Sequence, residues 1–319
     1  MQLDAQEVKK IGEAIQKAET ILLICHKSPD GDTLGSGLGL YHSLKAIGKK
    51  PTVACIDPPS PEFSFMPEIE TVQLGIEHIN YDLIFTVDAG ATHLTGVHEK
   101  FPELFNKSRE VVNIDHHPTN DFYGKYNLVV TKAAANTMIV YQLLMDLGLP
   151  VTRDAATCLL TGLYTDTGSF MHSNTDQEAL MIGARLLAKG ANLRSISKEI
   201  FNTTKISTMK LWGKVLKGTY QTPEGVTMSV VTKQDFEEAG ADYSEMSGVV
   251  DYVNSVPNSV YSVILTERDN VVKGSLRTLH DDVNVSEIAS QYGGGGHVKA
   301  AGFSVKGHLE KEVRWKVID

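Results

Sequence analysis

The sequence predicts an α/β protein in which a parallel-sheet domain is joined by a helical connector to a smaller α+β domain. Short apolar runs alternate with helical stretches in the first half, an order typical of a parallel sheet with crossover helices. The residues from about Gln177 to Gly218 are helical without strands, and strand-like segments return after them. Single cores usually stop growing near about 250–300 residues, and this chain has 319. We therefore expect domains at residues 1–188 and 219–319, with the connector at 189–218.

The first domain should begin with a helix and a buried strand. Apolar residues recur at helical spacing through Val8–Ala18, and the apolar, β-branched run Ile21–Cys25 follows them. Further strands are expected at Pro51–Ile56, Leu83–Asp88 and Glu110–Asp115, and helices at Thr33–Ile47, Asn136–Leu147 and Arg153–Tyr164. Gly48 and Gly148 stand where two of these helices should stop.

The remaining residues predict helices and then a mixed domain. Helices are expected at Ala179–Lys189, Leu193–Phe201 and Ile206–Leu216. After them come expected strands at Val226–Thr232, Ser259–Thr266 and Val271–Thr278, and a short helix at Val283–Tyr292. That helix runs into four consecutive glycines and His297, so a glycine-rich loop should follow it.

Composition excludes several classes of function. With 30 Lys and Arg against 39 Asp and Glu, the net charge of −9 argues against a sequence-independent grip on long duplex nucleic acid. The three cysteines form neither a disulfide framework nor a C-x-x-C metal pair, which fits a reducing cytoplasm. The longest early apolar run, Ile21–Cys25, is far too short for a membrane span or a signal core. We expect a cytoplasmic protein that does not enter membranes.

Metal-type ligands gather after three predicted strands. They are His26, Asp30 and Asp32 after the first, Asp88 at the end of the third, and Asp115, His116 and His117 at the fourth. Ligands in parallel sheets collect at these carboxyl ends, where converging carboxylates would repel one another unless a cation neutralised them. Mixed nitrogen and oxygen ligands suit Mn²⁺, whereas Mg²⁺ prefers oxygen alone. The structural alternative is that Asp30 and Gly31 form a turn, Asp32 caps the next helix and Asp88 caps a loop.

Two further features fit a metal centre. The adjacent imidazoles of His116 and His117 must point to different sides, so one could ligate a metal while the other meets a substrate. Asp166 stands near the C-terminal end of an otherwise apolar helix, where the macrodipole disfavours a carboxylate. A nearby cation would offset that cost.

A dinucleotide-binding interpretation must also be weighed. Gly35, Gly37 and Gly39 follow a strand, and Asp57 ends the next strand about twenty residues later. The glycines run G-x-G-x-G and lie inside the predicted helix, while Asp30 would repel a pyrophosphate from the turn itself. We favour glycines that let this helix lie close against the sheet.

The run Gly293–Gly296 before His297 suggests a second site. It lacks the Lys-Ser/Thr of a P-loop, yet its backbone N–H groups could approach an anion without obstruction. Arg277, at the end of a predicted strand, could clamp a phosphate with two hydrogen bonds. The alternative is a flexible loop beside a surface arginine, but four consecutive glycines are entropically costly, which favours a functional interpretation.

Taken together, these motifs resemble the DHH phosphoesterase superfamily. The series His26-x-x-x-Asp30-x-Asp32, Asp88, Asp115-His116-His117 and Asp166 occurs in the superfamily's order. The glycine run with His297 and Ala300-Ala301-Gly302 looks like its DHH-associated nucleotide-binding domain. In size and layout the chain is most similar to the bacterial branch that combines nanoRNase with 3′-phosphoadenosine 5′-phosphate phosphatase.

The resemblance implies a role for each motif residue. There would be two ions, Mn²⁺ or alternatively Mg²⁺. One would be held by His26, Asp30 and Asp88, and the other by Asp32, Asp88, His116 and Asp166. Asp88 would be the bridge, Asp115 would lie beside the centre, and His117 would meet the scissile phosphate or act as the acid. The substrate's other phosphate would be received by Arg277, Gly293, Gly294, Gly295, Gly296 and His297. The substrate would then lie between the domains, and family analogy implies a homodimer.

The implied activity is a metal-dependent phosphodiesterase or phosphatase acting on short oligonucleotides or phosphorylated nucleotides. Two stretches depart from relatives: residues 89–95 lack an arginine, and Ala134–Met138 lacks a Ser-Thr pair and a nearby glutamate. All six metal positions are intact, so the departures bear on substrate preference. The alternatives are a cyclic di-AMP or linear dinucleotide phosphodiesterase, a single-strand exonuclease and a non-catalytic nucleotide sensor. An inorganic pyrophosphatase is disfavoured, because that relative has a different C-terminal domain.

Overall fold

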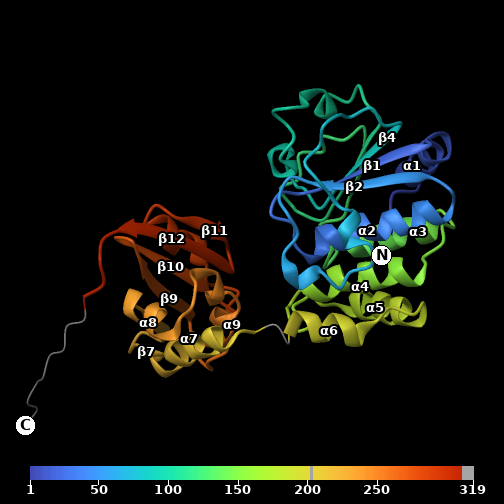
Figure 1. Ribbon diagram of the computed structural model, residues 1–319. Helices are drawn as coiled ribbons and strands as arrows, with labels where there is room; N and C mark the ends of the chain where they lie inside the picture. Colours follow the sequence, from blue (N-terminus) through green and yellow to red (C-terminus); the bar gives the residue numbers. More distant parts are fainter. Residues whose placement is uncertain (202–203, 311–319) are drawn as a thin grey trace, which may run out of the picture. The chain divides into compact units, whose positions relative to one another are not determined.

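The computed structural model describes residues 1–201 and 204–310, and the chain divides into two compact units, Met1–Thr203 and Thr204–Asp319 (Figure 1). In the described residues each unit contains a six-stranded sheet. The first sheet is parallel with helices packed on it, and the second belongs to a smaller α+β unit, so the predicted fold class is confirmed. A search of the described helices finds none with the length and apolarity needed to cross a membrane.

The sheet of the first unit has the strand order β3-β2-β1-β4-β5-β6. Its strands are β1 (Thr20–Cys25), β2 (Lys50–Cys55), β3 (Gln73–Leu74), β4 (Leu83–Val87), β5 (Val111–Asp115) and β6 (Tyr126–Val129). The order reverses between β1 and β4, and in open α/β sheets ligands bind at the carboxyl ends of the strands that flank such a reversal. The four predicted strands are confirmed, while β3 and β6 are additional.

The two faces of this sheet are covered differently. Ile21 and Leu23 of β1 point into a large core shared with the helices, whereas Leu22 and Ile24 join a smaller core with Val97 and other loop residues. The helices around the large core are α1 (Ala5–Lys17), α2 (Gly31–Ala46), α3 (Asn136–Asp146), α4 (Arg153–Asp166), α5 (Gln177–Ala188) and α6 (Leu193–Phe201). Both faces are therefore buried, which accounts for the continuous apolar character of the strands.

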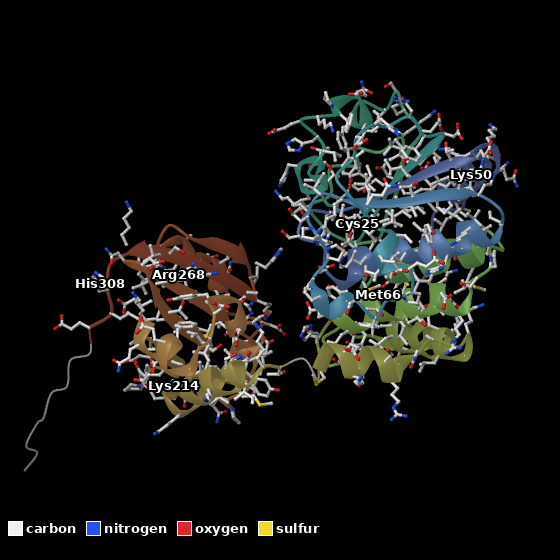
Figure 2. All side chains as sticks on the ribbon, viewed as in Figure 1. Cys25, Lys50, Met66, Lys214, Arg268 and His308 are labelled. Carbon is white, nitrogen blue, oxygen red and sulfur yellow. The ribbon has the colours of Figure 1, made fainter. Side chains whose placement is uncertain are left out.

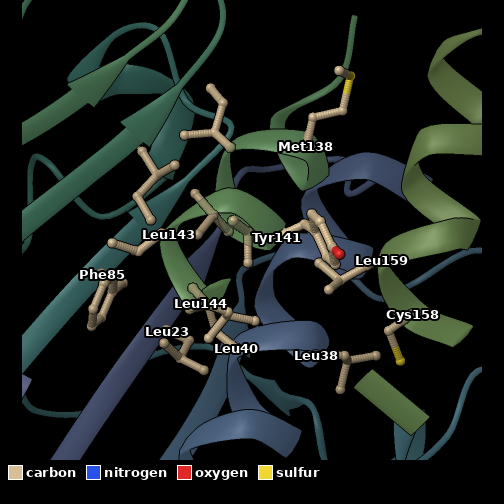
Figure 3. Close-up of a cluster of buried hydrophobic side chains, with 14 of the residues drawn as sticks. Leu23, Leu38, Leu40, Phe85, Met138, Tyr141, Leu143, Leu144, Cys158 and Leu159 are labelled. Carbon is tan, nitrogen blue, oxygen red and sulfur yellow. The ribbon is translucent and has the colours of Figure 1, made fainter. Parts of the chain in front are cut away.

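The large core is dense where the sheet meets α2, α3 and α4. Figure 3 shows Leu23 of β1 near Leu40 of α2 and Leu144 of α3, and all three side chains are fully buried. Each such side chain contributes about 1.5–3 kcal/mol relative to an exposed one. Figure 2 shows Cys25 inside this unit, while Lys50 at the start of β2 is exposed.

The glycines of α2 serve close packing. An added Cβ at Gly35 would lie 2.5 Å from the carbonyl oxygen of Cys158 in α4, and one at Gly39 would lie 2.6 Å from Leu159 Cδ2. At Gly37 it would lie 2.8 Å from Cys25 Sγ. The expected approach to the sheet therefore holds for Gly37, and the other two glycines bring α2 against α4 instead.

The helices that the sequence analysis assigns to a connector are divided between the two units. α6 belongs to the first unit, because its Ile196 is fully buried in the large core. α7 (Ile206–Lys217) belongs to the second unit, where Leu211 and Val215 are fully buried in a separate core.

The sheet of the second unit has the order β11-β12-β10-β9-β8-β7, antiparallel except between β8 and β9. Its strands are β7 (Tyr220–Gln221), β8 (Val226–Val231), β9 (Tyr261–Arg268), β10 (Val271–Arg277), β11 (Gly295–His297) and β12 (Ala300–Lys306). Its helices besides α7 are α8 (Lys233–Ala239), α9 (Val249–Asn254) and α10 (Val285–Ser290). Ile264 packs in the core of α7 and α9, and its neighbour Val263 packs on the other face with α10. Part of the expected glycine loop is thus the edge strand β11.

Candidate metal centre

The predicted ligands of the first unit meet at the carboxyl ends of three neighbouring strands. His26 follows β1, Asp88 follows β4 and His116 follows β5. These strands are adjacent in the order β1-β4-β5, so the fold brings together residues that are about thirty to ninety positions apart in the chain. His26 and Asp88 flank the point where the strand order reverses.

The first cluster contains His26, Asp30 and Asp88. His26 Nε2 lies 3.6 Å from Asp30 Oδ1 and 3.5 Å from Asp88 Oδ2. Asp30 Oδ1 also accepts hydrogen bonds from the backbone N–H groups of Asp32 and Thr33, both at 3.0 Å. Helix α2 begins at Gly31, so its N-cap is Asp30. The structural alternative, in which Asp32 caps this helix, is therefore wrong on this point. These two hydrogen bonds fix the Asp30 carboxylate through Oδ1 and leave other lone pairs of the carboxylate free to bind a cation.

The second cluster contains Asp32, His116 and Asp166. His116 Nε2 lies 3.9 Å from Asp32 Oδ2 and 3.9 Å from Asp166 Oδ2. Ligand atoms of the three residues all lie within 4.8 Å of one another, a spacing at which they could surround one ion. Asp166 is the last residue of α4, which is the unfavourable helix end that the sequence predicts.

Asp88 belongs to the first cluster and also faces the second. Its Oδ2 faces His26, and its Oδ1 lies 3.4 Å from His116 Nε2. The side chain is buried, and Oδ1 has no hydrogen-bond partner within the described residues. A buried carboxylate oxygen without a donor is costly unless a cation lies against it. The backbone of Asp88 is also strained, with φ of +57°, a conformation that aspartate adopts at a cost.

The tautomers of both histidines suit metal binding. His26 Nδ1 lies 2.8 Å from the carbonyl oxygen of Lys27, and His116 Nδ1 lies 3.1 Å from that of Ala133. A carbonyl only accepts, so each Nδ1 must carry the proton and donate it. Each neutral ring then turns the Nε2 lone pair towards the carboxylates, which is the arrangement of metal-ligating histidines.

The charges of the centre favour bound positive charge. Burial acts to lower the pKa of His26, but the hydrogen-bonded carboxylates of Asp30 and Asp88 outweigh it and raise this pKa to about 10. Burial likewise opposes protonation of His116, and the carboxylates around it, led by Asp88, raise its pKa to about 10. Without another cation, protons would therefore occupy both rings at neutral pH.

The carboxylates show the same excess of negative charge. Burial and the neighbouring Asp88 raise the pKa of Asp166 to about 6, although His116 acts against this. Burial, Asp88 and Asp166 together raise the pKa of Asp32 well above its ordinary value. A divalent cation would remove the repulsion and return these groups to their ionised form. The residues present thus fit divalent metal.

Asp32 is held by the start of another helix. The backbone N–H groups of Asn136 and Thr137 donate to its two oxygens, at 2.5 and 3.0 Å. The N-cap of α3 is Ala135, which has no side chain able to cap, so Asp32 satisfies these amides in its place. The negative charge is also stabilised by the positive end of the α3 dipole.

His117 forms a third candidate group with Asp88 and His116, its Nδ1 lying 3.7 Å from Asp88 Oδ1, but its nearest partner is Asp115. Its Nδ1 donates to Asp115 Oδ1 at 2.8 Å, and Asn120 Nδ2 donates to Asp115 Oδ2 at 2.6 Å. Asp115 is fully buried, whereas the His117 side chain is 42% exposed. This hydrogen bond to Asp115 raises the pKa of His117, although partial burial acts to lower it. Burial acts to raise the pKa of Asp115, but the hydrogen bonds from His117 and Asn120 outweigh it and lower this pKa. His117 is thus a partly exposed imidazole whose protonated form is favoured by Asp115.

The predicted phosphate residues of the second unit lie on one sheet. Arg277 of β10 pairs in register with Ala300 of β12, and Ala300 pairs with His297 of β11. Directly paired residues share a face of the sheet, so Arg277 and His297 flank the small Ala300 on one side. Arg277 also lines a hollow of about 590 Å³ on this unit, together with Lys273 and Ser275 of the same strand.

The four glycines of the run Gly293–Gly296 differ in what requires a glycine at each position. An added Cβ at Gly294 would lie 2.2 Å from the carbonyl oxygen of Gly302, and one at Gly296 would lie 2.6 Å from that of Ala300. Gly293 has φ of +73°, a left-handed turn that glycine adopts without strain. An added Cβ at Gly295 would meet no atom within 4 Å, and the φ of Gly295 lies outside the range that L-residues rarely adopt. Packing and turn geometry account for three of the glycines and leave Gly295 without a structural requirement.

Several residues of the centre are absent from the sequence analysis. Asn120 orients Asp115, the amides at the start of α3 hold Asp32, and the carbonyl of Ala133 orients His116. For Asn120 the signal was a polar residue three positions after the His116-His117 pair. The backbone partners carry no side-chain signal at all.

Comparison with known proteins identifies the family. The model of the DHH family, N-terminal domain, matches residues 20–163, and that of the DHHA1 domain matches residues 224–318. The bifunctional oligoribonuclease and PAP phosphatase NrnA of Thermus thermophilus is 35% identical over 95% of this chain and 89% of its own length. The chain belongs to the DHH family. This DHH protein is therefore a phosphoesterase, a hydrolase of phosphate esters.

Other similar proteins agree with this assignment. NrnA of Bacillus subtilis is 25% identical to the DHH chain over 90% of each sequence. The crystal structure of an exopolyphosphatase-related protein from Bacteroides fragilis superposes with a TM-score of 0.87, covering 96% of this chain and 93% of that one at 24% identity. The structural likeness supports the fold of both units.

Proposed function

We propose that this DHH protein hydrolyses short oligoribonucleotides and 3′-phosphoadenosine 5′-phosphate at a centre that holds two divalent cations. The observation that carries the proposal is the position of Asp88, whose two oxygens each face the Nε2 of a different histidine. A carboxylate so placed is suited to bridge two ions. The substrates are those named for the NrnA relatives, which this chain matches over nearly its whole length.

The two clusters define the expected ligand sets. One ion would be held by His26, Asp30 and Asp88. The other would be held by Asp32, His116 and Asp166, joined by Asp88, whose Oδ1 lies 3.4 Å from His116 Nε2. Each set combines an imidazole nitrogen with carboxylate oxygens, which favours Mn²⁺ over Mg²⁺. When bound, the ions would supply a water of lowered pKa and neutralise the phosphoryl oxygens.

His117 is suited to handle the leaving group. Asp115 holds its ring through Nδ1, which leaves Nε2 for the substrate, and it raises the pKa of the ring, which favours the protonated form. The protonated ring can donate to the leaving oxygen, or stabilise the negative charge that develops on it. Asn120 keeps Asp115 in the orientation that this requires.

The second unit is suited to recognise a further phosphate. Arg277 offers a planar donor set that matches phosphate oxygens, with His297 on the same sheet face. Short nucleotides with more than one phosphate would then bind better than mononucleotides. This preference would separate short oligonucleotides from isolated phosphate esters.

The test is a side-by-side hydrolysis assay with Mn²⁺ on a dinucleotide, a 5-mer RNA, 3′-phosphoadenosine 5′-phosphate, cyclic di-AMP and pyrophosphate. We expect turnover of the first three, and loss of turnover in chelator or after His116→Ala. His78→Ala is the matched control, because His78 is a surface imidazole stacked on Tyr81 before β4. Full activity of metal-stripped protein in chelator would end the proposal, and preferred cleavage of cyclic di-AMP would change the substrate.

A further inference from the structure

One short turn contacts two of the three members of the second cluster. The turn comprises residues 133–137, where the chain enters α3, and we refer to it as the 133–137 turn. Its Ala133 carbonyl accepts from His116 Nδ1, and its amides at Asn136 and Thr137 donate to the carboxylate of Asp32. The third member, Asp166, is connected to the turn by a side chain from elsewhere.

That side chain is Asn174. Its Nδ2 donates to the carbonyl oxygen of Ala134 at 3.1 Å and to that of Asp166 at 3.2 Å. One amide group therefore ties the end of α4, which carries Asp166, to the turn that holds the other two members. An exposed asparagine has no packing reason to be fixed, so these two bonds determine its position.

The chain after α4 is shaped to present Asn174 at this point. Gly168, Ser169 and Phe170 all have positive φ, between +52° and +64°, which reverses the chain directly after Asp166. The ring of Phe170 packs edge-on against Tyr164, with centroids 5.9 Å apart. The left-handed conformations of Ser169 and Phe170 cost conformational energy, and such strain persists where the surrounding structure over-determines it.

The first cluster is held in another way. The Nδ1 of His26 donates to the neighbouring Lys27 carbonyl, and Asp30 accepts from the first amides of its own helix. These are local contacts that a change at residue 174 should leave intact. The two clusters therefore differ in which part of the chain orients them.

We propose that Asn174 is a positioning residue that sets the affinity of the second ion site, which contains Asp32, His116 and Asp166 together with the shared Asp88, without setting that of the first. This rests on the proposed function, because it presumes that both clusters bind ions. Loss of a hydrogen bond that orients a ligand typically weakens metal affinity by about 10–100-fold. Asn174→Ala should therefore weaken one of two Mn²⁺ binding steps by that factor.

The experiment measures Mn²⁺ binding to the full chain by titration calorimetry and electron paramagnetic resonance, with the metal-free Tm recorded alongside. Asn106→Ala is the matched control, because Asn106 is an exposed asparagine of the same unit that bonds to Ser108. We expect wild type and the control to bind two ions, and Asn174→Ala to bind one as before and the other more weakly. Its kcat should recover at high Mn²⁺ concentration, while the concentration for half activity rises.

Three results would overturn the assignment: unchanged affinities for both ions, a parallel loss of both, or a lower metal-free Tm with normal Mn²⁺ binding. A wild-type chain that binds no Mn²⁺ would instead remove the proposed function itself. The two failures are therefore distinguishable.

Discussion

Replacing Gly162 by alanine should damage the metal centre more than the fold. Gly162 lies inside α4, and an added Cβ would be 2.5 Å from Thr137 Cγ2 and 2.8 Å from Asp32 Oδ1. Alanine is better than glycine in a helix by about 1 kcal/mol, whereas overpacking a core costs about 1–3 kcal/mol. The net loss of unfolding free energy should therefore be about 0–2 kcal/mol.

The effect on catalysis should be larger. Asp32 Oδ1 would have to retreat by about 0.6 Å to reach the 3.4 Å of ordinary contact, which exceeds the roughly 0.5 Å within which a functional group must be held. A misplacement of about 1 Å can cost about 100-fold in rate. We expect kcat/KM to fall by about 10–100-fold, measured from initial rates on a dinucleotide at several Mn²⁺ concentrations.

Gly213→Ala is the matched control for this prediction. Gly213 is an exposed glycine inside α7, and an added Cβ there has no neighbour within 4 Å. That variant should gain about 0.5–1 kcal/mol in urea unfolding of its unit and keep its full activity. Wild-type kcat/KM in Gly162→Ala would refute the claim that a Cβ at position 162 displaces the carboxylate of Asp32.

Three further predictions concern other groups. Arg277→Ala should raise KM for a dinucleotide and leave kcat nearly unchanged in steady-state kinetics, because the role proposed for Arg277 is to bind the substrate and not to react; a fall in kcat alone would contradict this. Asn120→Leu leaves a buried oxygen of Asp115 without a donor and should cost about 1–3 kcal/mol in urea denaturation; unchanged stability would count against the hydrogen-bonded chain. Hydrogen bonds led by the Thr208 hydroxyl lower the pKa of Glu245 to about 2 from 4.5. Because the folded pKa is the lower one, this stabilisation is full above pH 4.5 and is lost as the pH falls towards 2, so Glu245→Gln should flatten the acid dependence of Tm.

The strand ends of the first unit could be predicted because they depend on local pattern. A buried parallel strand is a continuous apolar run, so the first polar residue after it, such as His26 or Asp88, marks the carboxyl edge. The short strands β3 and β11 could not be found in this way. β11 contains two glycines and a histidine, and it is a strand because β12 supplies hydrogen-bond partners.

The contacts that orient the candidate metal ligands could not be predicted from the sequence, for another reason. Asp32 is held by backbone amides 104 and 105 positions away, and Asn174 bonds to a carbonyl 40 positions away. Backbone atoms are the same in every residue, so only the folded arrangement shows which of them meet. α6 is a similar case, because its apolar face predicts burial but not the core that Ile196 enters.

The contact between α2 and α4 has a consequence for how this protein tolerates change. Asp32 lies at the start of one helix and Asp166 at the end of the other, and Gly35 of α2 and Gly162 of α4 stand where the two helix backbones meet without room for a Cβ. Where no side chains separate two helices, none can change conformation to accommodate a shift of one helix, so the two helices should move as one rigid body. A saturation mutagenesis screen for activity should then show a line of intolerant positions, running from Gly35 to Gly39 and away from any ligand. Selection for metal chemistry would be visible along the whole helix pair.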